Sequence, residues 1–116
     1  MSGAATFFSL ITGLVVIGAG GFDFTDPPKT VQLMRRLGYR YGFHRFLGLV
    51  KILGGLGLLI GLAITPIGIL AALGLCIYFV LAVRAHARLG DPGQESIPAA
   101  ALFMLSALSL LTIILS

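Results

Sequence analysis

Ionisable and hydroxyl side chains are rare in the apolar stretches of this 116-residue chain, so each of them raises a chemical question. Lys51 lies in the run GLVKILGGLGLLIG, and Tyr78 and Ser106 lie in two later apolar runs. A buried ammonium needs a counter-ion or several hydrogen-bond acceptors. Asp23, just past the first apolar run, is the acid placed to pair with it. We predict a polar cluster of these four residues. Either Lys51 has a structural partner and snorkels to the membrane surface, or the cluster binds a ligand.

Two histidines, His44 and His86, mark the ends of apolar segments that are neighbours in the chain. Imidazoles from adjacent helices can ligate a haem or donate a hydrogen bond to a quinone carbonyl. The more ordinary interpretation, which we favour over haem, places them at a helix boundary with no ligand. The sequence has no metal-ligand spacing, and we expect no metal site. Nucleophile-elbow, Walker and dinucleotide-binding motifs are also missing, so we do not expect an enzyme by itself.

Four apolar stretches, at about residues 4–21, 44–64, 66–85 and 97–115, must position these side chains. Each is close to the length of about 20 residues that a helix needs to cross a bilayer. With 58% hydrophobic and 10% charged residues, the composition is that of a membrane protein. The first stretch lacks the basic start of a signal peptide, so it counts as a helix. We predict an all-α, polytopic membrane four-helix bundle, folded as one domain over residues 1–116.

The basic residues lie on one side of this predicted bundle. Eight Lys and Arg stand against four Asp and Glu, and apart from Lys51 the cations lie in or beside the first and third connections. The positive-inside rule then puts both basic connections in the cytoplasm and both termini outside a cell membrane. Such cations suit anionic lipids on the cytoplasmic side, and we expect no nucleic acid.

The first connection contains a short amphipathic pattern. Asp26 precedes two prolines, as at a helix start, and Val31, Met34 and Leu37 recur at helical spacing before Gly38, a plausible stop. We predict an interfacial helix over residues 28–37, between helices 1 and 2, on the membrane surface. An irregular loop whose arginines only set topology is the alternative.

Glycines on the second helix indicate where its neighbours come close. Gly48, Gly54 and Gly55 share the face of Lys51, and an adjoining stripe has GxxxG spacing. This face therefore turns Lys51 toward the bundle interior, at a depth of roughly 9 Å from Arg45. The predicted helix-packing glycines, including one beside Tyr78 in the third helix, are Gly48, Gly54, Gly55, Gly57, Gly61 and Gly74.

The second half of the chain resembles the DoxX-like family of small four-helix membrane proteins. The likeness rests on FLGLVKILGGLGLLIG, on TPIGILAALGLCIYFVLAVRAHARLGD and on the final apolar helix, about residues 40–114, with a looser match to the first helix and GAGGFDF. The resemblance implies a four-helix bundle and, for parts of the family, a membrane subunit of quinone-linked or thiol-related redox systems. Other relatives resemble assembly or chaperone-like factors. Many members have a glutamate where this chain has Lys51, so a proton-handling role is not carried over.

Two functional hypotheses follow. In the first, a polar cavity in the cytoplasmic half holds a quinone or a lipid, and the chain is an accessory or ligand-holding subunit of a quinone- or redox-linked membrane system. In the second, the glycine faces and the basic surface helix dock another membrane protein or a second copy, in a structural or chaperone-like role with no ligand of its own.

Overall fold

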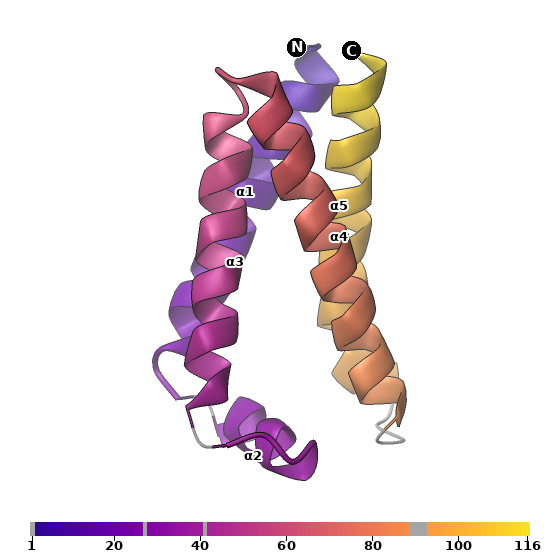
Figure 1. Cartoon of the computed structure of the whole chain (residues 1–116). Helices are drawn as coiled ribbons and strands as arrows, with labels where there is room; N and C mark the ends of the chain where they lie inside the picture. Colours follow the sequence, from indigo (N-terminus) through magenta and orange to yellow (C-terminus); the bar gives the residue numbers. More distant parts are fainter. Residues whose placement is uncertain (1, 27, 41, 89–92) are drawn as a thin grey trace.

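The computed structural model describes residues 2–26, 28–40, 42–88 and 93–116, and this part of the chain is helical with no strand. The helices are α1 (Gly3–Asp23), α2 (Pro28–Arg36), α3 (Phe43–Ile60), α4 (Thr65–Arg88) and α5 (Gly93–Leu115) (Figure 1). Four of them are long and apolar enough to cross a membrane. The all-α four-helix prediction is therefore confirmed. α3 ends four residues earlier than expected, and α5 begins four residues earlier, at Gly93 instead of residue 97.

The four long helices form two close pairs. α1 packs along α3 and α4 packs along α5, while α3 and α4 are joined by the short connection 61–64. The N-terminus, the C-terminus and this connection lie at one end, which we call the terminal end (Figure 1). α2, the start of α3 and the end of α4 lie at the other, which we call the basic end. α3 and α4 diverge from the terminal end toward the basic end.

Glycine pairs bring α1 and α3 into backbone contact. A Cβ atom added to Gly20 would lie 2.5 Å from the carbonyl oxygen of Gly48, and one added to Gly55 would lie 2.7 Å from that of Gly13. Neither position has room for a side chain. Such close approach provides the packing that hydrophobic attraction does not supply between helices in lipid.

The seam between α3 and α4 widens because its side chains grow larger. Near the connection, Gly61 lies directly against the backbone of Gly68 and has no space for a Cβ atom, and a Cβ on Gly68 would lie a tight 3.1 Å from Gly61 Cα. Farther along, Gly57 faces Ala71, and Gly54 faces Leu75. The next position of the α4 seam is Tyr78, beside Lys51. Larger residues hold the helices farther apart, which accounts for their divergence.

Gly74 differs from the other five predicted packing glycines. It is exposed, and no atom of the described chain lies within 4 Å of a Cβ added there. Expecting it at a close helix contact was therefore wrong within this chain. The α4 seam follows residues 68, 71, 75 and 78, and residue 74 lies on the neighbouring face.

The short helix α2 lies at the basic end of the bundle (Figure 1). It ends at Arg36, one residue before the predicted end at Leu37, because Gly38 takes a φ of +86° and closes the helix. The Gly38 N–H donates to Arg35 O at 3.0 Å and the Tyr39 N–H donates to Met34 O at 3.0 Å, the pair of bonds that defines a Schellman cap. Met34 is buried and anchors the helix.

Hydroxyl groups join α1 to α5 nearer the terminal end. Thr12 Oγ1 and Ser109 Oγ lie 2.9 Å apart, and the Ser109 hydroxyl also donates to the carbonyl oxygen of Phe8 at 3.1 Å. All the long helices also carry exposed, large apolar side chains on their outer surfaces. An apolar exterior over a core that contains the polar groups is the arrangement that a bilayer favours.

Candidate ligand-binding site

A cavity of about 710 Å³ lies at the basic end, where α3 and α4 have diverged. This volume is within the range of about 300–1,000 Å³ that is usual for small-molecule sites. All five helices contribute to its wall. Its apolar lining includes Met34, Leu47, Phe79, Ala82, Ala85 and Leu102, and its polar lining includes Asp23, Lys29, Gln32, Arg36, His44, Lys51, Tyr78 and His86.

Asp23 and Lys51 form an ion pair in this wall. Lys51 Nζ donates to Asp23 Oδ2 at 2.9 Å, and the two side chains are 16% and 8% exposed, respectively. α1 and α3 run in opposite directions (Figure 1), and Asp23 lies level with Gly48, since a Cβ on Gly48 would be 2.9 Å from Asp23 Cβ. Lys51 lies about one turn farther from the basic end, and its side chain leans back toward the start of α3 to reach Asp23. The pairing offsets the cost of placing either charge there.

Tyr78 is the aromatic neighbour of this pair. Its ring centroid lies 5.8 Å from Lys51 Nζ, within the range of a cation–π contact, and its ring meets Phe79 edge-on at 5.0 Å. Within the described part of the chain, the Tyr78 hydroxyl makes no hydrogen bond. An ammonium has three donors, and Lys51 uses one of them on Asp23. The wall therefore offers a bound oxygen two kinds of donor.

Ser106 does not belong to this group. Its side chain is fully buried, its hydroxyl donates to the Leu102 carbonyl oxygen one turn earlier at 2.8 Å, and it does not line the cavity. The sequence left this alternative open, since Ser commonly bonds to its own helix. The structure thus brings together three of the four residues predicted to cluster.

His44 and His86 both line the cavity, one from α3 and one from α4. His44 is 1% exposed, and its Nε2 lies 2.6 Å from Asp26 Oδ1. The structure thus gives His44 a carboxylate partner that the sequence analysis missed. The sequence pattern predicts for Asp26 only a position at a helix start.

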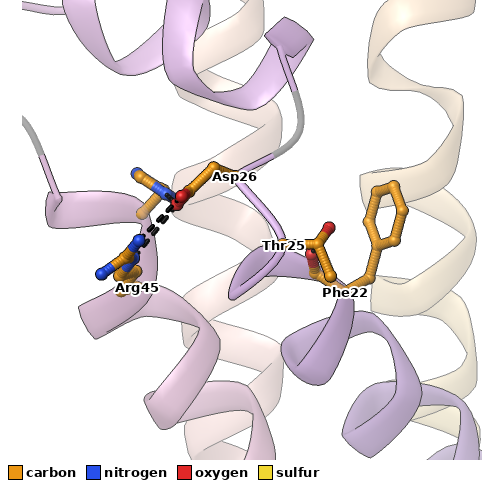
Figure 2. Close-up of polar contacts among 5 residues, drawn as sticks. Phe22, Thr25, Asp26 and Arg45 are labelled. Carbon is orange, nitrogen blue, oxygen red and sulfur yellow. Dashed lines mark hydrogen bonds and ion pairs between the residues drawn. The ribbon is translucent and has the colours of Figure 1, made fainter.

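Asp26 also binds the first turn of α3 through Arg45. Its carboxylate accepts from Arg45 Nε at 3.0 Å and from the guanidinium Nη2 at 2.7 Å (Figure 2). These bonds, chiefly those from Arg45 and then that from His44, lower the pKa of Asp26 to about 2. Asp26 adopts a φ of 56°, a left-handed conformation that Asp tolerates better than most residues. The ion pairs hold the chain after α1 against the start of α3.

The helix α2 adds charges to the cavity that the sequence analysis did not assign to a site. Lys29 and Arg36 line the cavity together with Lys51, and Asp23 is the one carboxylate among its described lining residues. The two α2 cations are seven residues apart, about two turns, so they lie on the same side of the helix. This spacing predicts that the two cations share one side of the helix, but it does not predict that this side docks onto the bundle.

Four long apolar helices, a glycine-packed interior and an apolar exterior define a small multi-pass membrane protein with a polar-lined cavity at one end. The sequence model of the DoxX-like family matches residues 7–109, and the chain belongs to that family. This match confirms the resemblance, including its looser part in the first helix. No curated protein and no solved structure matches the chain.

Proposed function

We propose that this DoxX-like protein holds one amphiphilic molecule in the cavity at its basic end. The observation that carries the proposal is a pair of donor residues beside an apolar wall: Lys51 and Tyr78 both line the cavity. A carbonyl or other acceptor oxygen would receive hydrogen bonds from them, and an apolar tail would lie along the leucine, phenylalanine and alanine wall. Lys51 then both pairs with Asp23 and recognises a ligand.

The proposed protein is an accessory subunit rather than a catalyst. The family resemblance supports a quinone- or redox-linked membrane system as its setting, with a quinone or a lipid as the held molecule. Seven cations favour a cytoplasmic location for the basic end, with the termini outside the cell membrane. These cations are Lys29, Arg35, Arg36, Arg40, Arg45, Arg84 and Arg88.

Docking of a partner membrane protein without any ligand has less support. That hypothesis used Gly54 and Gly57 as contact surfaces for another protein. Both glycines instead face α4 of the same chain, against Leu75 and Ala71. A partner or a second copy would have to use the outer faces of the helices.

Lys51→Met tests the proposal, because it keeps the apolar stem and removes the ammonium. Native mass spectrometry of the detergent-purified protein should show a bound lipophile in the wild type and several-fold less in the variant. The matched control is Ser106→Ala, which removes a polar group from the same bundle but away from the cavity. Its bound fraction should equal that of the wild type.

Loss of Lys51 also leaves Asp23 without its counter-ion, so a second variant separates binding from folding. Asp23→Leu with Lys51→Met removes both charges together and should fold as a well-packed apolar pair. Reduced lipophile in this double variant, with an unchanged melting temperature, supports the proposal. A wild type that retains no lipophile, or a double variant that retains as much as the wild type, contradicts it.

A further inference from the structure

We infer that the molecule held in the cavity is a neutral amphiphile with a free hydroxyl group, such as a glycerol monoester or a long-chain alcohol. Its hydroxyl donates to Asp23 Oδ1 and accepts from the Lys51 ammonium and the Tyr78 hydroxyl. This inference rests on the proposed function and names the ligand class of the same site. It follows from the hydrogen-bonding groups that the ion pair of Asp23 with Lys51 leaves unused.

The carboxylate of Asp23 has an unused oxygen. Lys51 Nζ binds Oδ2 at 2.9 Å, and no group in the described part of the chain donates to Oδ1. The Asp23 side chain is only 8% exposed, and it lines the cavity. An ionised carboxylate has about four acceptor sites, and a buried ion pair offsets its desolvation only when its remaining lone pairs and protons also find partners. Asp23 therefore leaves an acceptor for a donor from outside the chain.

Tyr78 and Lys51 provide unused donors beside this oxygen. Tyr78 Oη makes no hydrogen bond in the described part of the chain, and Lys51 keeps N–H groups beyond the one that it donates to Asp23. Among the described residues that are not exposed, Ser9 Oγ is the one side-chain polar atom that is both fully covered and unpaired. The unpaired Asp23 Oδ1 and Tyr78 Oη therefore retain accessible surface, and both residues line the cavity. A bound molecule meets an acceptor and donors together.

A hydroxyl group matches this set of atoms, and a charged group does not. Asp23 and Lys51 already neutralise each other, so a ligand carboxylate at the pair would lie beside the Asp23 carboxylate, and a ligand ammonium beside that of Lys51. Like charges repel strongly in a partly desolvated site. A ketone or ester carbonyl is neutral but only accepts, so it would leave Asp23 Oδ1 unpaired, which costs free energy in a buried site. A hydroxyl both donates and accepts, and it adds no charge.

The apolar part of the lining suits the chain of such an amphiphile. Leu47 of α3, Phe79 of α4 and Leu102 of α5 line the cavity together with the polar group. In a bilayer, however, a hydrocarbon chain gains little by moving from lipid tails to an apolar wall, because the two surroundings are about equally apolar. The hydrogen bonds at Asp23, Lys51 and Tyr78 therefore provide the selectivity of the site.

The test compares hexadecanol with hexadecyl methyl ether, in which a methyl group replaces the hydroxyl hydrogen. Delipidated full-length protein in an amine-oxide detergent, which has no hydroxyl group to compete, is mixed with equal amounts of the two probes. Native mass spectrometry measures the bound fraction of each. We expect the wild type to retain hexadecanol about tenfold over the ether, because a hydrogen bond to a charged acceptor contributes roughly that factor.

Variants assign this preference to the ion pair. Asp23→Leu with Lys51→Met removes the acceptor and the ammonium together, and it should bring the two probes to within about twofold. Tyr78→Phe keeps the ring and removes a donor that serves both probe oxygens. It should lower retention of both probes by about threefold and leave the preference intact. The matched control is Ser106→Ala, which removes a buried hydroxyl that does not line the cavity and should equal the wild type in both respects.

Equal retention of hexadecanol and the ether by the wild type would overturn the inference, since the ligand would then need only an acceptor, as a quinone or an ester provides. An undiminished preference in the double variant would overturn it as well, because the hydroxyl would then donate to another group. The wild-type comparison needs no variant, so it decides even where the double variant does not fold. In both results the cavity holds a lipophile, and the proposed function survives. Failure of the wild type to retain either probe contradicts the proposed function itself.

Discussion

α3 meets α1 and α4 in different ways. Along α1 it makes repeated backbone contacts through Gly13 with Gly55 and Gly20 with Gly48, so the two helices stay close over most of their length. Along α4 its glycines face residues of increasing size, from Gly68 through Ala71 to Leu75, and the next seam residue, Tyr78, lies beside Lys51. The comparison shows that the cavity follows from a gradient of side-chain size along one seam, while the other seam holds the bundle together.

The two interfaces of α3 also play different roles in positioning the charged residues. The constant α1–α3 contact places Asp23 level with Gly48, within reach of the Lys51 side chain, and the widening α3–α4 seam opens a space beside that pair. One interface therefore positions the polar cluster and the other makes it accessible. Changes in the first should affect folding, and changes at the basic end should affect binding or local stability.

The largest effect is expected from Gly55→Leu, which breaks the close interface. Its Cβ would lie 2.7 Å from the Gly13 carbonyl oxygen and 2.6 Å from Ile17 Cγ1, so backbone would have to move. Overpacking of this kind should cost about 3 kcal/mol or more of folding free energy. Thermal unfolding of the detergent-solubilised protein, followed by circular dichroism, measures the loss.

Gly74→Leu is the matched control for this change. It inserts the same side chain into the middle of α4, where the described chain leaves open space. Its melting temperature should equal that of the wild type or rise slightly, because Leu also favours the helix over Gly. Equal destabilisation by both substitutions would show that the α1–α3 contact is not special.

Asp23→Ala should have the next largest effect. It leaves Lys51, only 16% exposed, without its counter-ion, at a cost of about 2 kcal/mol, less than for a fully buried pair because the side chain can reach toward the basic end. Chemical or thermal unfolding in detergent gives the value. Asp23→Leu with Lys51→Met should recover most of the loss. A double variant as unstable as Asp23→Ala would argue against charge desolvation as the cause.

Acid should weaken the attachment of the chain after α1 to α3. The pKa of Asp26 falls from an ordinary 3.8 to about 2 in the folded protein, chiefly because Arg45 stabilises the carboxylate. The folded state therefore binds the proton less tightly than the unfolded state, and this contribution is present above pH 4 and is lost as the pH falls toward 2. Melting temperatures between pH 5 and 2 measure it.

Asp26→Asn is the control for the pH dependence. The amide cannot titrate, so the part of the acid-induced decrease that belongs to Asp26 should disappear, while the variant melts lower than the wild type at pH 5. Parallel curves for the two proteins between pH 4 and 2 would assign the decrease to other carboxylates.

Much of the fold follows from one-dimensional patterns. In lipid, an apolar run of about 20 residues satisfies its backbone hydrogen bonds by forming a helix. The sequence also contains few polar residues that could be partners for Lys51. Its contacts with Asp23 and Tyr78 were thus among a small number of options. The surroundings of Gly74 could not be predicted in the same way. Helical spacing assigns a residue to a face of its helix, but it does not tell which neighbouring helix covers that face.

The cavity and the role of α2 depended on tertiary structure. Lys29 and Arg36 have the spacing of an ordinary solvated or lipid-facing side, and only the docking of α2 through Met34 turns them to the cavity. Asp26 likewise needs a φ of 56° to reach His44 and Arg45, which sequence spacing does not encode. Ser106 is the opposite case, because its hydroxyl donates to a carbonyl oxygen of its own helix and needs no partner from another helix.

The smallest effect is expected from Thr12→Val, which tests the hydroxyl contact between α1 and α5. It removes the hydrogen bond to Ser109 at 2.9 Å and keeps the shape of the side chain. Ser109 still donates to Phe8 or to its own helix, so no donor is left unpaired. Bonds of this kind between membrane helices average about 0.6 kcal/mol, and we expect that loss. Ser106→Ala, which removes a bond within one helix, should cost less. A Thr12→Val loss as large as that of Gly55→Leu would place the main stabilising contact at α5 instead of α3.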